Sequence, residues 1–223
     1  LYRSYDDNKS KKVSNETLNK ELQILRRFCN HCIDMEWMDI NPFRSIKSFK
    51  VDTRKQRYFF TDADINLIMD NAGKFKAFYT LLLYTGIRST DAYKKKKHIQ
   101  GRYLCIKMNK TKDTLNIPLS YTIMPLLKVI LEDIAGDGDL LFPDFQSNRQ
   151  RRNCCKVVQG CFDIEMVRKN NINLHTFRHT YAHNMLNKGV PKEVLQTLLG
   201  HRSIKTTEIY ANWVRKEELE RWV

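Results

Sequence analysis

His175-Thr-Phe-Arg178-His-Thr-Tyr-Ala182, followed by Leu198-Leu-Gly-His201 and then by Tyr210, is the stretch that says most about the fold and chemistry of this chain. An arginine can hold a phosphate in a bidentate fork, a histidine can move a proton near neutral pH, and a tyrosine hydroxyl can form a covalent ester. His175 and Arg178 are three residues apart on a predicted helix, so both side chains face one anion. The stretch therefore indicates chemistry on a phosphodiester.

The charge balance of the chain favours a polyanionic partner. Its 223 residues include 39 Lys and Arg against 25 Asp and Glu, which gives a formal net charge of +14. Nucleic acid fits this charge. An anionic membrane surface fits less well, because no apolar run reaches the roughly 18 residues that span a bilayer and no lipidation motif is present. We expect a cytoplasmic protein, since no signal-peptide pattern is present, and the start at Leu1 suggests part of a longer chain.

The N-terminal residues predict a short helical unit. Apolar residues recur at steps of three and four from Ser14 to about Trp37, as on one stripe of an amphipathic helix. Asn41-Pro42 ends that unit, and the stretch 44–57 carries six basic residues, typical of a basic linker or a solvated loop. Thr61-Asp-Ala-Asp64 has the form of a capping box. These signals divide the chain into residues 1–50, a linker at 51–60 and a main domain at 61–223.

The main domain is predicted to be mainly α with a small antiparallel β-sheet. A strongly apolar helix over 77–84 stops at Thr85-Gly86, where glycine turns the backbone before Arg88. The guanidinium of Arg88 then needs an anionic partner, which Asp91 can supply. Runs at 103–106 and 115–119 are β-prone and flank a polar turn that carries Lys110, which predicts a hairpin. Helical periodicity covers residues 121–134, 157–168, 174–186 and 191–199.

Two patterns raise the question of a metal, and neither predicts one. His175, His179 and His183 are spaced by four, but no glutamate follows the first histidine and no third ligand type is evident. We expect His175 to be functional and His179 to satisfy hydrogen bonds in the core. Cys29-Asn-His-Cys32 has no second ligand pair at matching spacing, so buried or half-buried thiols are expected there.

Taken in order along the chain, these motifs resemble those of the tyrosine recombinase, or phage integrase, family. Thr85-Gly-Ile-Arg88-Ser-Thr-Asp91 is similar to the first arginine box of that family, and Lys110 to its hairpin lysine. The 175–182 stretch is similar to the His-x-x-Arg box, Leu198-Leu-Gly-His201 to the second histidine box, and Tyr210 to the nucleophile. The resemblance covers about residues 61–210, and it implies that residues 1–50 are the C-terminal part of a helical core-binding domain that clamps DNA.

The resemblance also implies a mechanism without metal or nucleotide cofactor. Arg88 and Arg178 would hold the non-bridging oxygens, His201 would add a hydrogen bond, and Tyr210 would attack phosphorus to give a 3′-phosphotyrosine. Lys110 would protonate the 5′-oxygen leaving group, and His175 would assist proton transfer from the tyrosine. The implied partner is double-stranded DNA, on which the protein would self-associate into a tetramer at paired sites.

Alternatives and two departures stand beside this resemblance. A type IB topoisomerase uses a similar residue set, and a DNA-binding regulator without chemistry would also explain the charge. A metal-dependent nuclease would need a carboxylate cluster, which the sequence lacks. After Asp91 the chain runs Ala92-Tyr-Lys-Lys-Lys-Lys97, where the family usually has an apolar residue. Fifty residues are also too few for the four helices that family core-binding domains supply.

Overall fold

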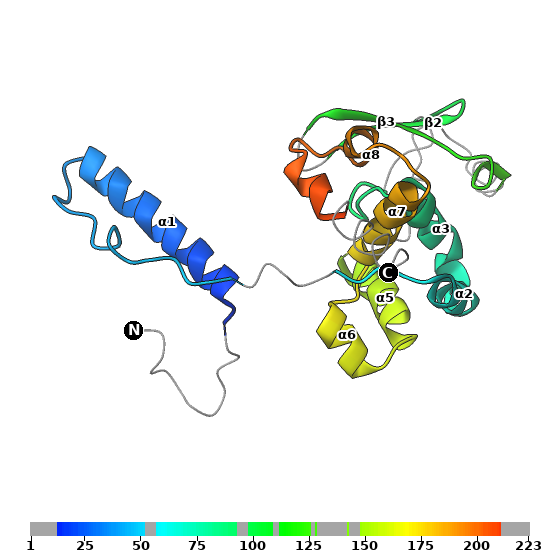
Figure 1. Cartoon of the computed structure of the whole chain (residues 1–223), viewed down its shortest axis with the longest axis horizontal. Helices are drawn as coiled ribbons and strands as arrows, with labels where there is room; N and C mark the ends of the chain where they lie inside the picture. Colours follow the sequence, from blue (N-terminus) through cyan, green and yellow to red (C-terminus); the bar gives the residue numbers. More distant parts are fainter. Residues whose placement is uncertain are drawn as a thin grey trace, which may run out of the picture. The chain divides into compact units, whose positions relative to one another are not determined.

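The structure of the chain is a computed structural model that describes residues 13–51, 57–92, 98–108, 112–125, 128, 142 and 148–210 (Figure 1). The chain divides into two compact units, Leu1–Lys55 and Gln56–Val223. Each unit has its own internal contacts and is described separately below. The division falls within the segment that composition marks as a linker.

The N-terminal unit is one long helix with an extended segment returning along it (Figure 1). Helix α1 covers Asn15–Asp34, and Ser14 caps it by accepting a hydrogen bond from the Thr17 backbone N–H. The predicted helix is confirmed, and it ends three residues before the expected Trp37. Its most buried side chains are Leu22, Cys29 and Cys32, so the two cysteines are buried thiols as expected.

The returning segment is fastened to α1 by side-chain amides. Asn15 donates to the Lys50 carbonyl at 2.7 Å, and Asn19 both donates to the Phe49 carbonyl at 2.9 Å and accepts from the Phe49 N–H at 2.8 Å. Arg26 donates from Nε to the Phe43 carbonyl at 2.9 Å. Residues 44–50, which composition alone assigns to a basic linker or a solvated loop, are therefore part of the N-terminal unit.

The second unit begins with the predicted capping box. The Asp64 N–H donates to Thr61 Oγ1 at 3.2 Å, and the Thr61 N–H donates to Asp64 Oδ2 at 2.9 Å. Helix α2 follows at Asp62–Asn71, then a short 3₁₀ turn, η1, at Gly73–Phe75 and helix α3 at Lys76–Thr85. Gly86 ends α3 with a left-handed φ of 61°, which confirms the predicted stop.

A small antiparallel sheet lies next in the chain. Strands β1 (Ile99–Gln100), β2 (Tyr103–Lys107) and β3 (Thr114–Pro118) pair in the order β1-β2-β3, with Cys105 opposite Asn116. Alternate residues face the core, so one face is buried and the other is polar. Those buried residues are Leu104, Ile106, Leu115 and Ile117. The predicted hairpin is confirmed, whereas Lys110 in its turn lies outside the described residues.

The remaining helices include one, α7, that is largely buried. They are α5 (Asn148–Gly160), α6 (Ile164–Asn170), α7 (His175–Asn187) and α8 (Lys192–Leu199), and residues 205–210 are again helical. Eight consecutive residues of α7, 176–183, are buried, because α3 packs on one side and α8 on another. Such all-round burial is how a helix becomes the centre of a domain.

Two sequence expectations differ from this fold or fall outside it. The single helix predicted over 157–168 is wrong, because the chain breaks at 161–163, where Asp163 adopts an extended conformation before α6. Of the helix predicted over 121–134, the structure describes only residues 121–125 and 128, of which 124, 125 and 128 are helical. The predicted class, mainly α with a small antiparallel sheet, is confirmed.

Candidate active site

Tyr210 lies inside the protein, against two histidines. Its side chain is 1% exposed, and its hydroxyl is 2.9 Å from Nδ1 of His179. The His201 ring lies parallel to the Tyr210 ring, with centroids 6.4 Å apart. Burial raises the pKa of the Tyr210 hydroxyl, and the charge of Arg178 opposes that rise. The tyrosine is therefore a protonated phenol held within a cluster of nitrogen bases.

Arg178 joins the ends of two helices beside Tyr210. Nη1 donates to the Gly86 carbonyl at 2.9 Å, and Nη2 donates to the Leu199 carbonyl at 2.6 Å. These carbonyls lie at the C-terminal ends of α3 and α8, where the helix dipole is negative and favours a cation. Arg178 is only 2% exposed, and desolvation followed by the nearby charge of Arg88 lowers its pKa to about 10. It remains a cation at neutral pH, with further N–H groups available to an anion.

Arg88 occupies the same neighbourhood through the turn that ends α3. Its Nη1 lies 3.7 Å from Asp91 Oδ2, so the anionic partner expected from the sequence is present. The same nitrogen lies 3.5 Å from the Met108 sulfur at the end of β2. Asp91 is almost fully buried, at 1% exposure, whereas Arg88 is partly exposed. A buried carboxylate thus holds a partly exposed guanidinium in place.

His201 follows the left-handed turn at Gly200 that closes α8. Its Nδ1 lies 2.9 Å from Thr207 Oγ1, which fixes the ring across the short gap to the 205–210 helix. Desolvation, followed by the charges of Arg178 and Arg88, lowers the pKa of His201 to about 3. The ring is therefore neutral at physiological pH. A neutral imidazole carries a single N–H, and only that N–H can donate a hydrogen bond to an anion.

His175 is the exposed member of the cluster, at the first residue of α7. Its ring meets the His179 ring edge to face, with centroids 4.7 Å apart. His179 is buried, and desolvation followed by the charge of His175 lowers the pKa of His179 to about 3. The structure thus brings five of the six predicted site residues into one region: Arg88, His175, Arg178, His201 and Tyr210.

The sixth predicted residue, Lys110, lies outside the described residues, but both ends of its hairpin turn are described. Met108 packs against Gly200, where an added Cβ would lie 2.5 Å from the Met108 sulfur. Arg202, next to His201, pairs with Asp113 on the other side of the turn, with Nε to Oδ2 at 3.0 Å. The hairpin that carries Lys110 is therefore attached to the turn that carries His201.

Two functional contacts were not predicted from the sequence. His179 was expected to serve only the core, yet it is the hydrogen-bond partner of the candidate nucleophile. Thr207 was not singled out, yet it holds His201. The spacing of four residues between His175 and His179 places them on one face, and it is the one signal that pointed to a shared neighbour.

The described part of the chain offers no other chemical centre. It holds no group of three His, Cys, Asp or Glu side chains arranged to bind a metal, and no helix in it is long and apolar enough to span a membrane.

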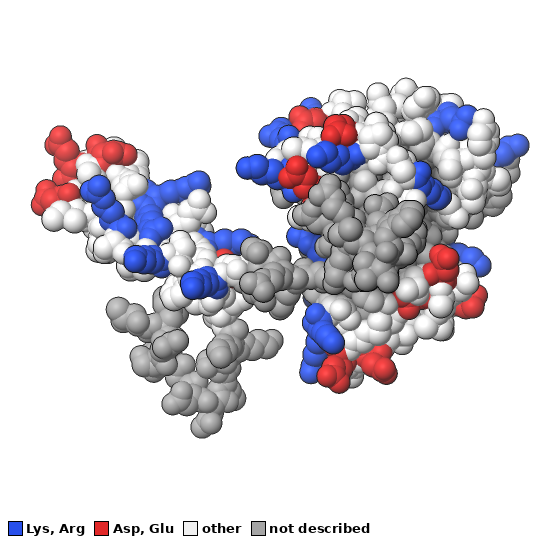
Figure 2. Space-filling model, in the orientation of Figure 1, with Lys and Arg blue, Asp and Glu red and all other residues white. Residues whose placement is uncertain are grey.

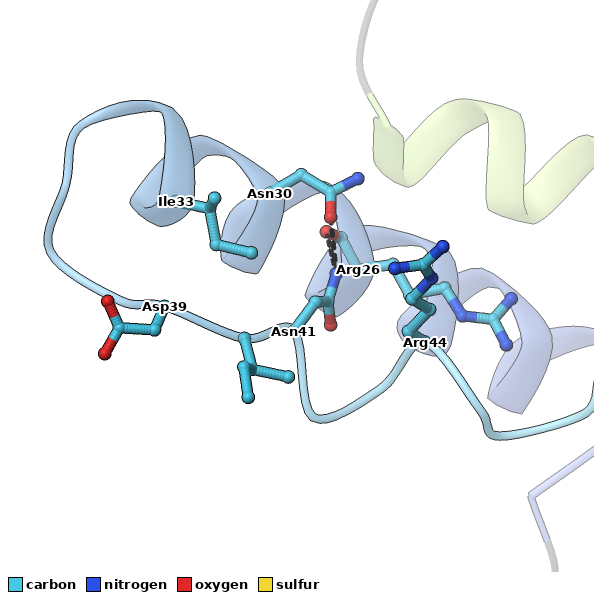
Figure 3. Close-up of a pocket in the computed structure, with 7 residues that line it drawn as sticks. Arg26, Asn30, Ile33, Asp39, Asn41 and Arg44 are labelled. Atoms are coloured by element: carbon cyan, nitrogen blue, oxygen red, sulfur yellow. Dashed lines mark hydrogen bonds between the residues drawn. The ribbon is translucent and has the colours of Figure 1, made fainter.

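A hollow in the N-terminal unit is lined by α1 and the loop after it, including Arg26, Asn41 and Arg44 (Figure 3). There Asn41 donates to the Asn30 side chain and to the Arg26 carbonyl, which closes the corner of the loop.

Basic side chains lie on both units, and on the N-terminal unit they form a group. Figure 2 shows Lys and Arg gathered over α1 and the segment that returns along it, with acidic residues at one end. The basic residues there are Lys20, Arg26, Arg27, Arg44, Lys47 and Lys50. A basic face of this kind suits a phosphate backbone.

Comparison with known proteins places this geometry in a family. A tyrosine recombinase of Thermosipho africanus is 24% identical over 212 residues, which cover 92% of this chain and 74% of that protein. Tyrosine recombinase XerC of Thermodesulfovibrio yellowstonii is 27% identical over 226 residues, with coverage of 93% and 74%.

Solved structures share the fold. A lambda integrase dimer bound to a COC′ core site matches with a TM-score of 0.67 and 17% identity over 88% of this chain and 59% of that chain. The Tn1549 transposon integrase in complex with a circular intermediate DNA matches with a TM-score of 0.69 and 18% identity, covering 96% of this chain and 81% of that one. The family model described as the phage integrase family matches residues 58–217, which include every candidate site residue, and the chain therefore belongs to that family.

Proposed function

We propose that this protein is a site-specific DNA recombinase that cleaves and rejoins DNA strands through a covalent bond between Tyr210 and a 3′-phosphate. It is a DNA strand-transferase of the phage integrase family, a family that acts in DNA integration and recombination. The observation that carries the assignment is the placement of Tyr210 beside Arg178 and His201, at the family's motif positions.

The two arginines supply what the transition state needs. Attack on a phosphodiester concentrates negative charge on the non-bridging oxygens, and preorganised cations stabilise that charge best where water is excluded. Arg178 is anchored at both Nη atoms by backbone carbonyls, and Arg88 is held by Asp91. Their guanidinium groups therefore keep a fixed position before DNA arrives, and His201 adds a hydrogen bond from the next turn.

Proton transfers complete the reaction. The Tyr210 oxygen bonds to phosphorus as its proton leaves with the assistance of His175, and the bond from phosphorus to the 5′-oxygen breaks. Lys110 gives that oxygen a proton, so a free 5′-hydroxyl results. Attack of a 5′-hydroxyl from a partner duplex on the phosphotyrosine reverses these steps and joins the strands. No metal takes part, and the adduct is expected to form in EDTA; its loss in EDTA would favour a nuclease.

A covalent capture assay tests the proposal. The full chain is incubated with nicked duplexes that carry a randomised stretch, denatured in SDS, and the attached DNA is recovered and sequenced. Because the nick lets the cleaved fragment diffuse away, the adduct accumulates. Mass spectrometry should place it on Tyr210, and Tyr210→Phe should form none. Tyr181→Phe is the matched control, since Tyr181 is also a buried tyrosine of the same cluster. An adduct with Tyr210→Phe would refute the assignment.

The DNA partner and its assembly follow from the same proposal. The structural relatives include integrase dimers bound to DNA, and we propose a tetramer of this chain on two paired sites. Mass photometry with the captured duplex should show that assembly. Exchange between two matched sites, rather than relaxation of supercoils alone, would separate a recombinase from a topoisomerase.

A further inference from the structure

Thr207 lies in the interior of the protein, with its hydroxyl against the His201 ring. It is 0% exposed, and its Oγ1 is 2.9 Å from Nδ1 of His201. Thr207 comes three residues before Tyr210 on the helical segment 205–210, so the two residues share one face of that segment. The contact therefore joins the segment that carries the candidate nucleophile to a histidine of the candidate site.

The backbone of His201 is held as well as its ring. The His201 N–H donates to the Gln196 carbonyl at 3.0 Å, and Gln196 Nε2 donates to the His201 carbonyl at 2.9 Å. These two bonds fix the residue at the end of α8, and the Thr207 contact fixes the direction of its ring. Because Thr207 engages Nδ1, a hydrogen bond from this ring to an anion has to come from Nε2.

The burial of Thr207 decides which of the two contacting atoms donates. A threonine hydroxyl carries one hydrogen, and a buried hydroxyl without an acceptor is penalised. Within the described part of the chain, Nδ1 of His201 is the only hydrogen-bond partner of the Thr207 hydroxyl. Donation from the hydroxyl to Nδ1 satisfies both atoms, whereas donation from an Nδ1–H would leave the hydroxyl hydrogen without an acceptor. The favoured arrangement therefore has a bare Nδ1.

A bare Nδ1 fixes the position of the one remaining ring hydrogen. Burial lowers the pKa of His201 to about 3, so the ring is neutral and carries a single N–H. With Nδ1 accepting from Thr207, that N–H is on Nε2. The opposite tautomer would present a lone pair at Nε2, which repels a phosphate oxygen.

We propose that Thr207 is a positioning residue that selects the tautomer of His201, because its hydroxyl donates to Nδ1 and so keeps the ring hydrogen on Nε2, from which His201 donates to a phosphate oxygen. Thr207 acts through His201 rather than on the phosphate itself. The effect on strand cleavage rests on the proposed function, whereas the tautomer can be measured without DNA.

The first experiment reads the tautomer of His201 in the DNA-free protein. Long-range proton–nitrogen NMR spectra of the full chain with labelled histidine separate a protonated ring nitrogen from a bare one, and His201→Phe assigns the signals. At neutral pH the parent should carry the hydrogen on Nε2. Thr207→Val keeps the shape of the side chain without the hydroxyl. It should lower the ratio of the Nε2–H to the Nδ1–H form by about two- to tenfold, the factor that one hydrogen bond is worth.

Two matched variants separate the hydroxyl from the rest of the side chain. Thr207→Ser keeps the hydroxyl and should keep the tautomer ratio of the parent. Thr206→Val makes the same substitution at the preceding residue, which is exposed, and should also leave the ratio unchanged. A hydrogen on Nδ1 in the parent would overturn the proposal, and so would an unchanged ratio in Thr207→Val. If Thr207→Val does not fold, the tautomer of the parent decides.

The second experiment links the tautomer to strand cleavage. In single-turnover covalent capture, Thr207→Val should form adduct about three- to tenfold more slowly than the parent, because the ring loses the bond that fixes both its hydrogen and its direction. Thr207→Ser should react at the rate of the parent. In the His201→Phe background, followed over longer incubations, Thr207→Val should cause no further loss, since the histidine through which it acts is absent.

The double variant distinguishes this role from a merely structural one. An equal loss with and without His201 would show that Thr207 serves the packing of the 205–210 segment, and it would overturn the proposal. An unchanged rate in Thr207→Val would do the same. If the parent forms no adduct at all, the proposed function fails, while the NMR spectra still decide whether Thr207 selects the tautomer of His201.

Discussion

Gly86 is the position where one added methyl group should do the most local damage. It ends α3 at a φ of 61°, a left-handed conformation that costs a residue with a Cβ about 1 to 2 kcal/mol. A Cβ at Gly86 would also lie 2.3 Å from Cδ1 of Tyr181 and 3.0 Å from Cδ2 of Leu199. Both neighbours are buried, so neither can move into solvent. Overpacking of this kind costs about 1 to 3 kcal/mol.

We therefore expect Gly86→Ala to lower the free energy of unfolding by about 2 to 5 kcal/mol. Gly189→Ala separates the two contributions, because Gly189 has a φ of 79° and nothing within 4 Å of an added Cβ. That control should lose only the backbone part, about 1 to 2 kcal/mol. The Gly86 carbonyl also accepts from Arg178, so adduct formation by Gly86→Ala should fall even where the protein remains folded.

Urea unfolding followed by circular dichroism measures both variants against the parent. Covalent capture at low temperature, where all three proteins are folded, then measures adduct formation. If Gly86→Ala loses no more stability than Gly189→Ala, the Tyr181 ring does not limit the space beside Gly86.

Three further predictions concern Arg178, the buried histidines and the hairpin attachment. Arg178→Lys should reduce adduct formation at least about a hundredfold, because an ammonium cannot reach both the Gly86 and Leu199 carbonyls and still offer a fork to phosphate; single-turnover capture within threefold of the parent would contradict this. Burial lowers the pKa of His179 from 6.5 to about 3 in the folded protein. Between pH 6.5 and pH 3 the unfolded chain therefore binds a proton at His179 that the folded chain does not, so the free energy of unfolding falls as the pH is lowered through this range. The loss for His179 should approach about 2 to 3 kcal/mol at pH 4.5, and urea unfolding of His179→Asn should show a shallower pH dependence; an unchanged slope would argue against it. Arg202→Ala should leave urea unfolding nearly unchanged despite the 3.0 Å contact with Asp113, because both side chains are largely exposed; a clear loss of stability would show that the pair is stronger than an ordinary surface ion pair.

Local signals in the sequence were reliable wherever a single residue type solves a local backbone problem. Ser14 and Thr61 start helices because their hydroxyls accept the first free N–H groups, and Gly86 ends α3 because it tolerates a left-handed turn. The break between α5 and α6 was missed, since apolar periodicity continues across residues 161–163 while the backbone does not. The attachment of residues 44–50 to α1 could not be predicted, because it is made by asparagine amides and backbone carbonyls, which leave no mark in charge or hydropathy.

The sequence by itself determined the family motifs, their order, and which residue types could perform phosphoryl transfer: two arginines, two histidines, a lysine and a tyrosine. Only the tertiary structure decided how they meet. It anchored Arg178 on the ends of α3 and α8, paired Asp91 with Arg88, and placed the Tyr210 hydroxyl against His179. The physical reason is that spacing along one helix specifies which side chains share a face. What lies across from that face depends on packing between segments about 20 to 90 residues apart.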